Sequence, residues 1–220
     1  MKSSKKKSCH GNLIAFIIFL ALGITGVYLS FPSLQMLLTG PQALDTFDYS
    51  AVKEAGFDHE YVSGAISGIY DYYCDEIRDD SLYAREYLID GGDYYYLGLR
   101  VKKADLEPAE TLLSASMDYL KGVDDGTALE KAKYTVTGTI KPMDSESISI
   151  LQEYLDYDTM DQTTRDTILF CYLDVGSIGA YNMPTIVTLL IFTVIFWALA
   201  LWFLIRFFAG RSKKKVRSQR

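Results

Sequence analysis

Two groups of acidic side chains are the residues best suited to chemistry in this chain. Aspartate and glutamate can act as general acid and general base when two of them share a cleft and burial raises the pKa of one. Carboxyl groups about 5–10 Å apart are the arrangement used in glycoside hydrolysis. The same residues are equally typical of a solvated acidic surface, so both interpretations stay open. The groups are Asp71, Asp75, Glu76, Asp79 and Asp80, and then Asp156, Asp158, Asp161 and Asp166.

The second acidic group begins like a calcium-binding loop, with Asp156 and Asp158 in the first and third positions. A calcium loop next needs an oxygen ligand, a glycine and a final bidentate glutamate. This chain has Met160, Asp161 and Thr167 in those places. The sequence therefore predicts no more than weak surface binding of a cation.

Histidine, the other common metal ligand and general base, is scarce between residues 32 and 183. His59 stands alone there, without further nitrogen or sulfur ligands at metal-binding spacing. A Ser-His-Asp triad would have to use the same His59, and the chain has no Gly-x-Ser-x-Gly motif to present the serine. We therefore assign no catalytic, metal-binding or cofactor-binding residue from the sequence and expect no cofactor.

Cys74 and Cys171 are the two cysteines of the same segment. Outside the cytoplasm such a pair can form a disulfide that joins distant parts of a domain. Cys74 lies near an apolar stripe and Cys171 lies in an apolar run, so two buried free thiols are an equally good interpretation. The sequence does not decide between a disulfide and free thiols.

The spacing of apolar residues predicts the elements that carry the first acidic group. Helical spacing in 59–77 favours a helix. The runs 85–89 and 94–101 flank the turn residues 90–93, Asp-Gly-Gly-Asp, which favours a β-hairpin. The helical positions are Val62, Ile66, Ile69, Tyr73 and Ile77.

The remaining elements follow the same rules. Asp105 is a candidate N-cap for a helix ending before Gly122, and the alternating run 134–140 predicts a strand. Asp144 begins another helix, and 168–175 is a short apolar strand. The expected fold class is α+β, a small mixed or antiparallel sheet with helices. The inner stripe expected for the helix after Asp105 is Leu106, Ala109, Leu113, Met117 and Leu120.

Two long uncharged segments enclose this domain and predict two transmembrane helices. All 28 acidic residues lie between them, whereas both outer ends are purely basic. Each segment is long enough to cross the hydrocarbon core of a bilayer, about 30 Å thick. The expected organisation is a basic tail (1–11), a transmembrane helix (12–31), an acidic extracytoplasmic α+β domain (32–183), a second transmembrane helix (184–206) and a basic tail (207–220).

Lysine and arginine near the ends of membrane helices stay in the cytoplasm, so both termini are expected there, in a multi-pass protein of the plasma membrane. Gly23, Gly26 and Ser30 form a small-residue face on the first segment, suited to close packing with another helix. The acidic domain would repel nucleic acid, which is excluded as a partner.

The motifs Tyr94-Tyr95-Tyr96-Leu97-Gly98, Tyr134-Thr135-Val136-Thr137-Gly138-Thr139-Ile140 and Met143-Asp144, set between two membrane segments, carry a family resemblance. The chain resembles uncharacterised two-helix membrane proteins of Gram-positive bacteria. The resemblance implies a bacterial plasma membrane and no particular activity.

Two functional hypotheses follow. The first is a membrane-anchored accessory, sensory or assembly protein that acts by binding through its extracytoplasmic domain. Its partners would be the bilayer and a membrane protein, or a second copy bound through the transmembrane helices. The alternative is a membrane-bound envelope enzyme that uses the clustered carboxylates. A cleft that holds two of those carboxylates would favour the enzyme, and a convex acidic surface would exclude it.

Overall fold

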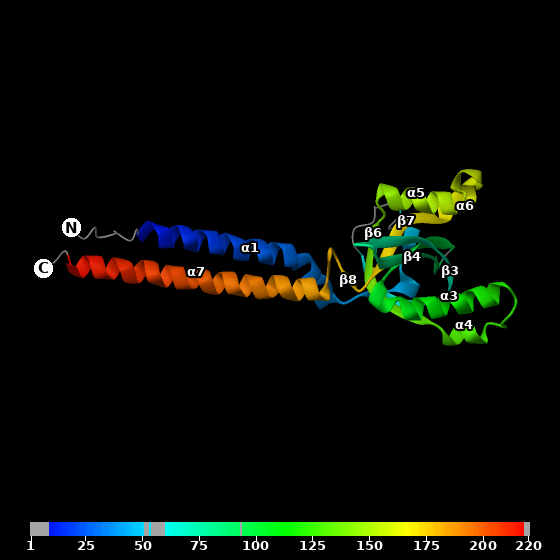
Figure 1. The fold of residues 1–220 in the computed structure, drawn as a ribbon, viewed down its shortest axis with the longest axis horizontal. Coiled ribbons are helices and arrows are strands. Elements are labelled where there is room, and N and C mark those ends of the chain that lie inside the picture. The colour runs from blue at the N-terminus through cyan, green and yellow to red at the C-terminus, as the bar shows by residue number, and fades with distance from the viewer. Residues whose placement is uncertain (1–8, 51–52, 54–59, 93, 218–220) are drawn as a thin grey trace. The chain divides into compact units, whose positions relative to one another are not determined.

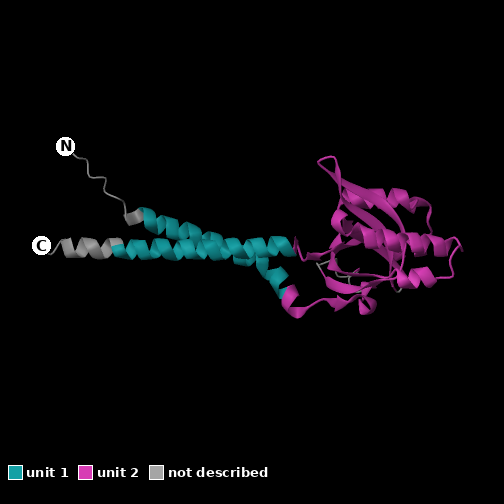
Figure 2. Cartoon of the chain, turned by 60° about the horizontal axis from the view of Figure 1, so that its bottom comes forward, with its two compact units in different colours: residues 1–35, 183–220 teal, residues 36–182 magenta. Residues whose placement is uncertain are grey.

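The computed structural model describes residues 9–50, 53, 60–92 and 94–217. The chain divides into two compact units (Figure 2). The helical unit comprises residues 1–35 and 183–220, and the α/β unit comprises residues 36–182.

The helical unit consists of α1 (Cys9–Thr39) and α7 (Met183–Arg217). Within these helices, Gly11–Thr39 and Met183–Ala209 are long and apolar enough, at 29 and 27 residues, to cross a membrane. α1 continues beyond residue 31, the expected end of its apolar segment, and contains Pro32. A proline inside a helix has no N–H to donate, so α1 lacks one backbone hydrogen bond at this point.

The small-residue face of α1 packs against α7. A β-carbon built on Gly23 would overlap the indole of Trp197, and one built on Gly26 would overlap the hydroxyl of Thr193. Ser30, on the same face, is fully buried. The contacts run in opposite directions along the two helices, which are therefore antiparallel. The close-packing face expected from the sequence is confirmed, and the helix that occupies it belongs to the same chain.

This contact predicts a crosslink. A β-carbon at position 26 would lie 3.4 Å from the Thr193 Cβ, close to the separation of about 3.8 Å found in disulfides. In a background with the three native cysteines replaced by alanine, Gly26→Cys with Thr193→Cys should form an intramolecular disulfide on mild oxidation of the full chain in mild detergent. Gly26→Cys with Val194→Cys is the matched control, because Val194 is 67% exposed. Equal crosslinking of the two pairs, read after proteolysis between the helices, would contradict the packing.

The α/β unit is built on a mixed sheet that contains seven strands among the described residues. The pairs β1–β2 and β5–β7 are parallel and the other pairs are antiparallel. In spatial order the strands are β1 (Gln42–Ala43), β2 (Tyr61–Ile66), β6 (Tyr134–Pro142), β7 (Ile168–Val175), β5 (Tyr95–Lys102), β4 (Ser81–Gly92) and β3 (Ile69–Arg78).

Helices cover both faces of this sheet (Figure 1). α3 (Leu106–Leu120) and α4 (Thr127–Lys131) lie on one face, and α5 (Ser145–Tyr154) and α6 (Gln162–Thr167) lie on the other. The mixed sheet with helices expected from the sequence is thus confirmed, in a larger three-layer form. Short elements complete the unit: η1 (Leu44–Thr46), η2 (Lys103–Asp105), η3 (Tyr157–Thr159), β8 (Ser177–Ile178) and β9 (Tyr181–Asn182).

The helix predicted over 59–77 is wrong: the described part of this segment forms β2 and β3. The β3–β4 connection is a two-residue turn in which Asp79 and Asp80 both have positive φ, the geometry of a tight hairpin. Val62 and Ile66 of β2 lie four residues apart, a separation that places two side chains on one face of a strand as well as of a helix. β3 is an edge strand with three register shifts, which break the alternation of its apolar residues. Their spacing matched a helix by coincidence, and Ile77 at the predicted inner face is 57% exposed.

Other local predictions are confirmed. The hairpin is β4–β5, and the strands predicted at 134–140 and 168–175 are β6 and β7. Asp144 caps α5, since its carboxylate accepts a 2.8 Å hydrogen bond from the Ser147 N–H. Asp105 precedes α3 but makes no such side-chain bond.

The buried face of α3 differs in part from the predicted stripe. Ala109 is buried as expected, but Leu112 and Ala115 accompany it, and Leu120 is 58% exposed. Leu112 enters the main core with strand residues such as Leu99 and Leu173.

Candidate functional site

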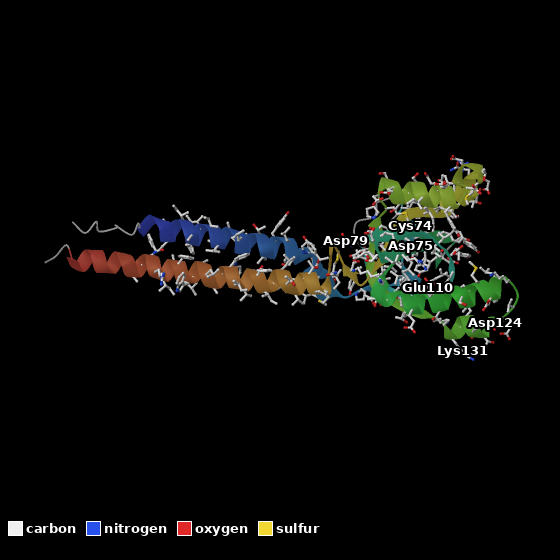
Figure 3. All side chains as sticks on the ribbon, in the orientation of Figure 1. Cys74, Asp75, Asp79, Glu110, Asp124 and Lys131 are labelled. Atoms are coloured by element: carbon white, nitrogen blue, oxygen red, sulfur yellow. The ribbon has the colours of Figure 1, made fainter. Side chains whose placement is uncertain are left out.

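The first acidic group lies along β3, an edge strand with three register irregularities. Its carboxylates do not gather on one surface. Asp75 faces α3, where Arg85 binds it through Nε at 2.6 Å and also binds Glu110 at 2.9 Å. Figure 3 labels Asp75 between Cys74 and Glu110, and Glu110 lies on α3. Glu76 faces the opposite side of the sheet, where it pairs with Arg100.

A cleft of about 480 Å³ lies between β3 and the first turns of α5. Cys74 and Glu76 of β3 form one wall, and Ser147 and Ile150 of α5 form another. Glu86 and Arg100, from the strands behind β3, also line the cleft. Five acidic residues line the cleft: Asp75 and Glu76 from the predicted group, and Glu86, Asp144 and Glu146 from outside it.

A row of polar side chains crosses the sheet on this side. Cys74 is the strand partner of Glu86, Glu86 is the partner of Arg100, and Arg100 is the partner of Asp174. Partners in register point to the same face of a sheet. The row thus runs over four strands, and Lys141 extends it through a 2.6 Å ion pair with Asp174.

Glu86 is the most deeply placed acid in the cleft, with only 3% of its surface exposed. Its Oε1 lies 3.9 Å from Arg100 Nε, whereas its Oε2 has no hydrogen-bond partner among the residues that the structure describes. Burial raises the pKa of the Glu86 carboxyl, and the nearby negative charges of Glu76 and Asp144 raise it further. Tyr73 and Arg100 oppose the shift without cancelling it.

Arg100 holds two carboxylates and a phenol. It pairs with Glu76, lies beside Glu86 and donates to the Tyr172 hydroxyl through Nη1 at 3.2 Å. Burial alone would lower the pKa of Arg100, but the charge of Glu76 and the interaction with the Tyr172 hydroxyl outweigh burial and raise it. The guanidinium is therefore a fixed positive charge at the base of the cleft.

Tyr73 reaches the same region because of a bulge and a glycine. The register shift between Tyr72 and Cys74 puts the consecutive residues Tyr73 and Cys74 on one side of the sheet. The Tyr73 side chain crosses to Gly98 of β5, where any β-carbon would collide with it. Burial and the neighbouring Glu86 raise the pKa of Tyr73, so its hydroxyl stays protonated.

Both cysteines are free thiols. Cys74 lines the cleft, whereas Cys171 is buried in the core cluster that α3 covers on the opposite face. β4 and β5 also separate their strands, which places the two about 14 Å apart at roughly 4.8 Å per strand. A disulfide needs Cα atoms about 4.4–6.8 Å apart. Of the two interpretations left open by the sequence, this structure contains the free thiols.

Two members of the second acidic group, Asp161 and Asp166, serve local structure. Asp161 caps α6 by accepting bonds from the N–H and hydroxyl of Thr164, and these bonds lower the pKa of Asp161. Asp166 accepts a bond from Gln162. Within the described ranges, no three aspartate, glutamate, histidine or cysteine side chains converge in an arrangement that could hold a metal ion. His59 lies outside the described residues.

Sequence reasoning missed Glu86 and Arg100. Each carried a signal, because each is a charged residue inside a run predicted to be a half-buried strand. A buried charge needs a partner of opposite sign. The β4–β5 hairpin supplies it, because Glu86 and Arg100 lie opposite each other in the pairing of the two strands.

The raised pKa of Glu86 predicts a pH dependence of stability. The folded state holds the Glu86 proton more tightly than the unfolded state, so the contribution of Glu86 to stability is fully present at low pH and is lost as pH rises from about 4.5 through the raised pKa. The loss is about 1.4 kcal/mol for each unit of the pKa difference. Glu86→Gln should therefore flatten the pH dependence and raise the free energy of unfolding at pH 7.

Urea unfolding of the full chain in mild detergent, followed from pH 4.5 to 8, measures this effect. Glu107→Gln, at an exposed position on α3, is the control with the same charge change. Identical pH slopes for wild type and Glu86→Gln would contradict the prediction.

Comparisons with known proteins give one match. A family model described as a domain of unknown function, DUF8577, matches residues 1–206. Searches of curated proteins and of solved structures found no match.

Proposed function

The chain belongs to the family of the domain of unknown function DUF8577, and we propose that it is a membrane-anchored accessory, sensory or assembly protein that acts by binding. The observation that carries the proposal is the cleft beside β3, which contains a buried carboxylate with an unpartnered oxygen. Ligand sites are usually preformed clefts of roughly 300–1,000 Å³ with a few fixed polar groups. The cleft of about 480 Å³ fits this description.

The proposal includes insertion of both long helices into the bacterial plasma membrane, with the α/β unit outside the cytoplasm. The basic residues of both ends support this orientation, since they flank the apolar helices while all acidic residues lie between them. An epitope tag inserted at Asp124, in the exposed connection after α3, tests the topology. Protease added to spheroplasts should remove that tag and spare tags at both termini, and the reverse pattern would contradict the orientation.

The α1–α7 contact bears on the choice of partner. Because Gly23 and Gly26 already pack against α7, the small-residue face of α1 is occupied within the chain. Association with a partner membrane protein, or with a second copy, would have to use other faces of the helices or the outer domain. This favours binding through the α/β unit.

Site-specific photocrosslinking in native membranes tests binding at the cleft. A benzophenone side chain at Ile150, which lines the cleft, should capture a ligand or partner. The same group at Thr111, exposed on α3 at the other face of the sheet, should not. Purification in mild detergent followed by mass spectrometry identifies what is bound. Equal capture at both positions, or capture at Thr111 alone, would overturn the proposal.

An envelope enzyme is the second candidate, favoured by one observation: Glu76 and Glu86 line the same cleft, and the raised pKa of Glu86 suits a general acid. Binding is the better supported function because Glu76 is held by Arg78 and Arg100. Two guanidiniums occupy that carboxylate, which leaves it less free to accept a proton from a substrate. Release of sugars or peptides from isolated envelope, lost in Glu86→Gln, would favour the enzyme instead.

A further inference from the structure

The cleft beside β3 has a charge that selects its ligand. Four carboxylates line it on the α5 side, from Glu76, Glu86, Asp144 and Glu146, against the two guanidiniums of Arg78 and Arg100. The formal balance with all six ionised is 2 − 4 = −2. Asp75 also borders the cleft, but its carboxylate is bound by Arg85 on the α3 side and is not counted. A cation is therefore attracted and an anion repelled.

Glu86 supplies an observation independent of this acidic lining. It is 97% buried, since 3% of its surface is exposed, and its Oε2 has no hydrogen-bond partner within the described part of the chain. An unpaired buried carboxylate oxygen is costly, because desolvation is not repaid. Arg100 Nε lies 3.9 Å from Glu86 Oε1, so the guanidinium offsets the cost of desolvation at that oxygen only. The Tyr73 hydroxyl is also buried and lies close enough to the Glu86 carboxyl to lower the pKa of Glu86, but within the described residues it does not reach hydrogen-bond geometry.

The chemistry of these groups favours a nitrogen cation over a metal ion. A divalent metal needs several converging oxygen, nitrogen or sulfur ligands, and no such group of three exists among the described side chains. An ammonium or guanidinium instead offers N–H donors, and one donor satisfies Oε2 of Glu86.

We propose that the cleft binds the ammonium or guanidinium group of a small organic cation, with Glu86 Oε2 as the acceptor at its base. The inference rests on the proposed binding function and names the ligand chemistry of the same site. Such a group is present both in free amines and in lysine or arginine side chains of peptides. The cleft volume of about 480 Å³ accommodates a ligand of that size.

Titration calorimetry of the full chain in mild detergent tests the proposal with defined probes. Spermidine represents free amines, and N-acetyl-lysine amide and N-acetyl-arginine amide represent peptide side chains. N-acetyl-glutamate is the anionic control and Ca²⁺ the metal control. We expect at least one of the three nitrogen cations to bind at about one molecule per chain. Tightest binding of spermidine would indicate a free amine as the ligand, and tightest binding of the lysine or arginine amide would indicate a peptide side chain.

Two variants locate the binding. Glu86→Gln should weaken it about tenfold to hundredfold, the effect of losing one charge-assisted hydrogen bond. Glu107→Gln, exposed on α3, should change affinity less than twofold. Near-ultraviolet circular dichroism checks that each variant is folded.

Three outcomes would overturn the assignment of the ligand. Glu86→Gln and Glu107→Gln could weaken the binding of the cation equally, or the glutamate probe or Ca²⁺ could bind more tightly than the nitrogen cations. The third is that no nitrogen cation binds at millimolar concentration. If the cations fail while the photocrosslinker at Ile150 still captures a molecule, the ligand chemistry is wrong and the binding function stands. If both fail, the binding function falls as well.

Discussion

Leu112→Ala should lower the free energy of unfolding of the α/β unit by about 2–5 kcal/mol, the cost of deleting a buried leucine side chain and leaving a cavity. Leu112 has no exposed surface and belongs to the main core cluster. Urea unfolding of the full chain in mild detergent, monitored by near-ultraviolet circular dichroism, gives the value.

Leu120→Ala is the matched control on the same helix. Leu120 is 58% exposed, so its replacement should change stability by about 0.5 kcal/mol or less. Periodicity in the sequence had put Leu120, and not Leu112, on the inner face of α3. A larger effect at Leu120 than at Leu112 would therefore restore the sequence-based helix face and contradict the structure.

Arg100→Met should destabilise the α/β unit by about 3–5 kcal/mol, because it leaves Glu86 and Glu76 without their shared positive charge. The Arg100 side chain is 18% exposed and that of Glu86 is 4% exposed, so solvent compensates little. Arg78→Met is the control: it removes a guanidinium that also pairs with Glu76 but is 54% exposed, and should cost about 1 kcal/mol or less.

A double-mutant cycle separates the charge effect from lost packing. With Glu86→Gln already present, Arg100→Met should cost clearly less than in the wild type, because the buried negative charge is gone. Both costs are read from urea unfolding at pH 7. Equal costs in the two backgrounds would mean that Arg100 stabilises the fold by packing alone.

Local signals in the sequence predicted several elements correctly. Asp144 before a polar-apolar helical pattern identified the start of α5, and the β-branched alternation around Val136 identified β6. The prediction for the segment 59–77 failed because residues four apart share a face in a strand as well as in a helix, and because three register shifts break the alternation along β3. In such a segment, only tertiary context distinguishes a strand from a helix.

The cleft was less predictable than the fold because it depends on strand register. A two-residue turn at Gly91 and Gly92 would set Glu86 opposite Leu97 and so on the apolar core face. In the structure Gly92 is itself paired, with Tyr95, so the chain reverses later, and the irregularity between Asp90 and Gly92 then shifts the remaining pairs by one residue, which sets Glu86 opposite Arg100. An odd shift of register moves side chains to the other face. No local pattern reveals such a bulge, so the charged pair emerged only from the structure.

The order of strands has a consequence for how the chain acquires its fold during synthesis. β7 is the last of the seven strands along the chain, yet it lies between β6 and β5 and joins the two halves of the sheet. Until residues 168–175 have been made, β6 and β5 each present an open edge, which is where strands of other chains pair and aggregate. A product that stops before residue 168 would be left with two small sheets and no common core. Completion of the domain is thereby tied to the arrival of the residues that directly precede β8, β9 and α7.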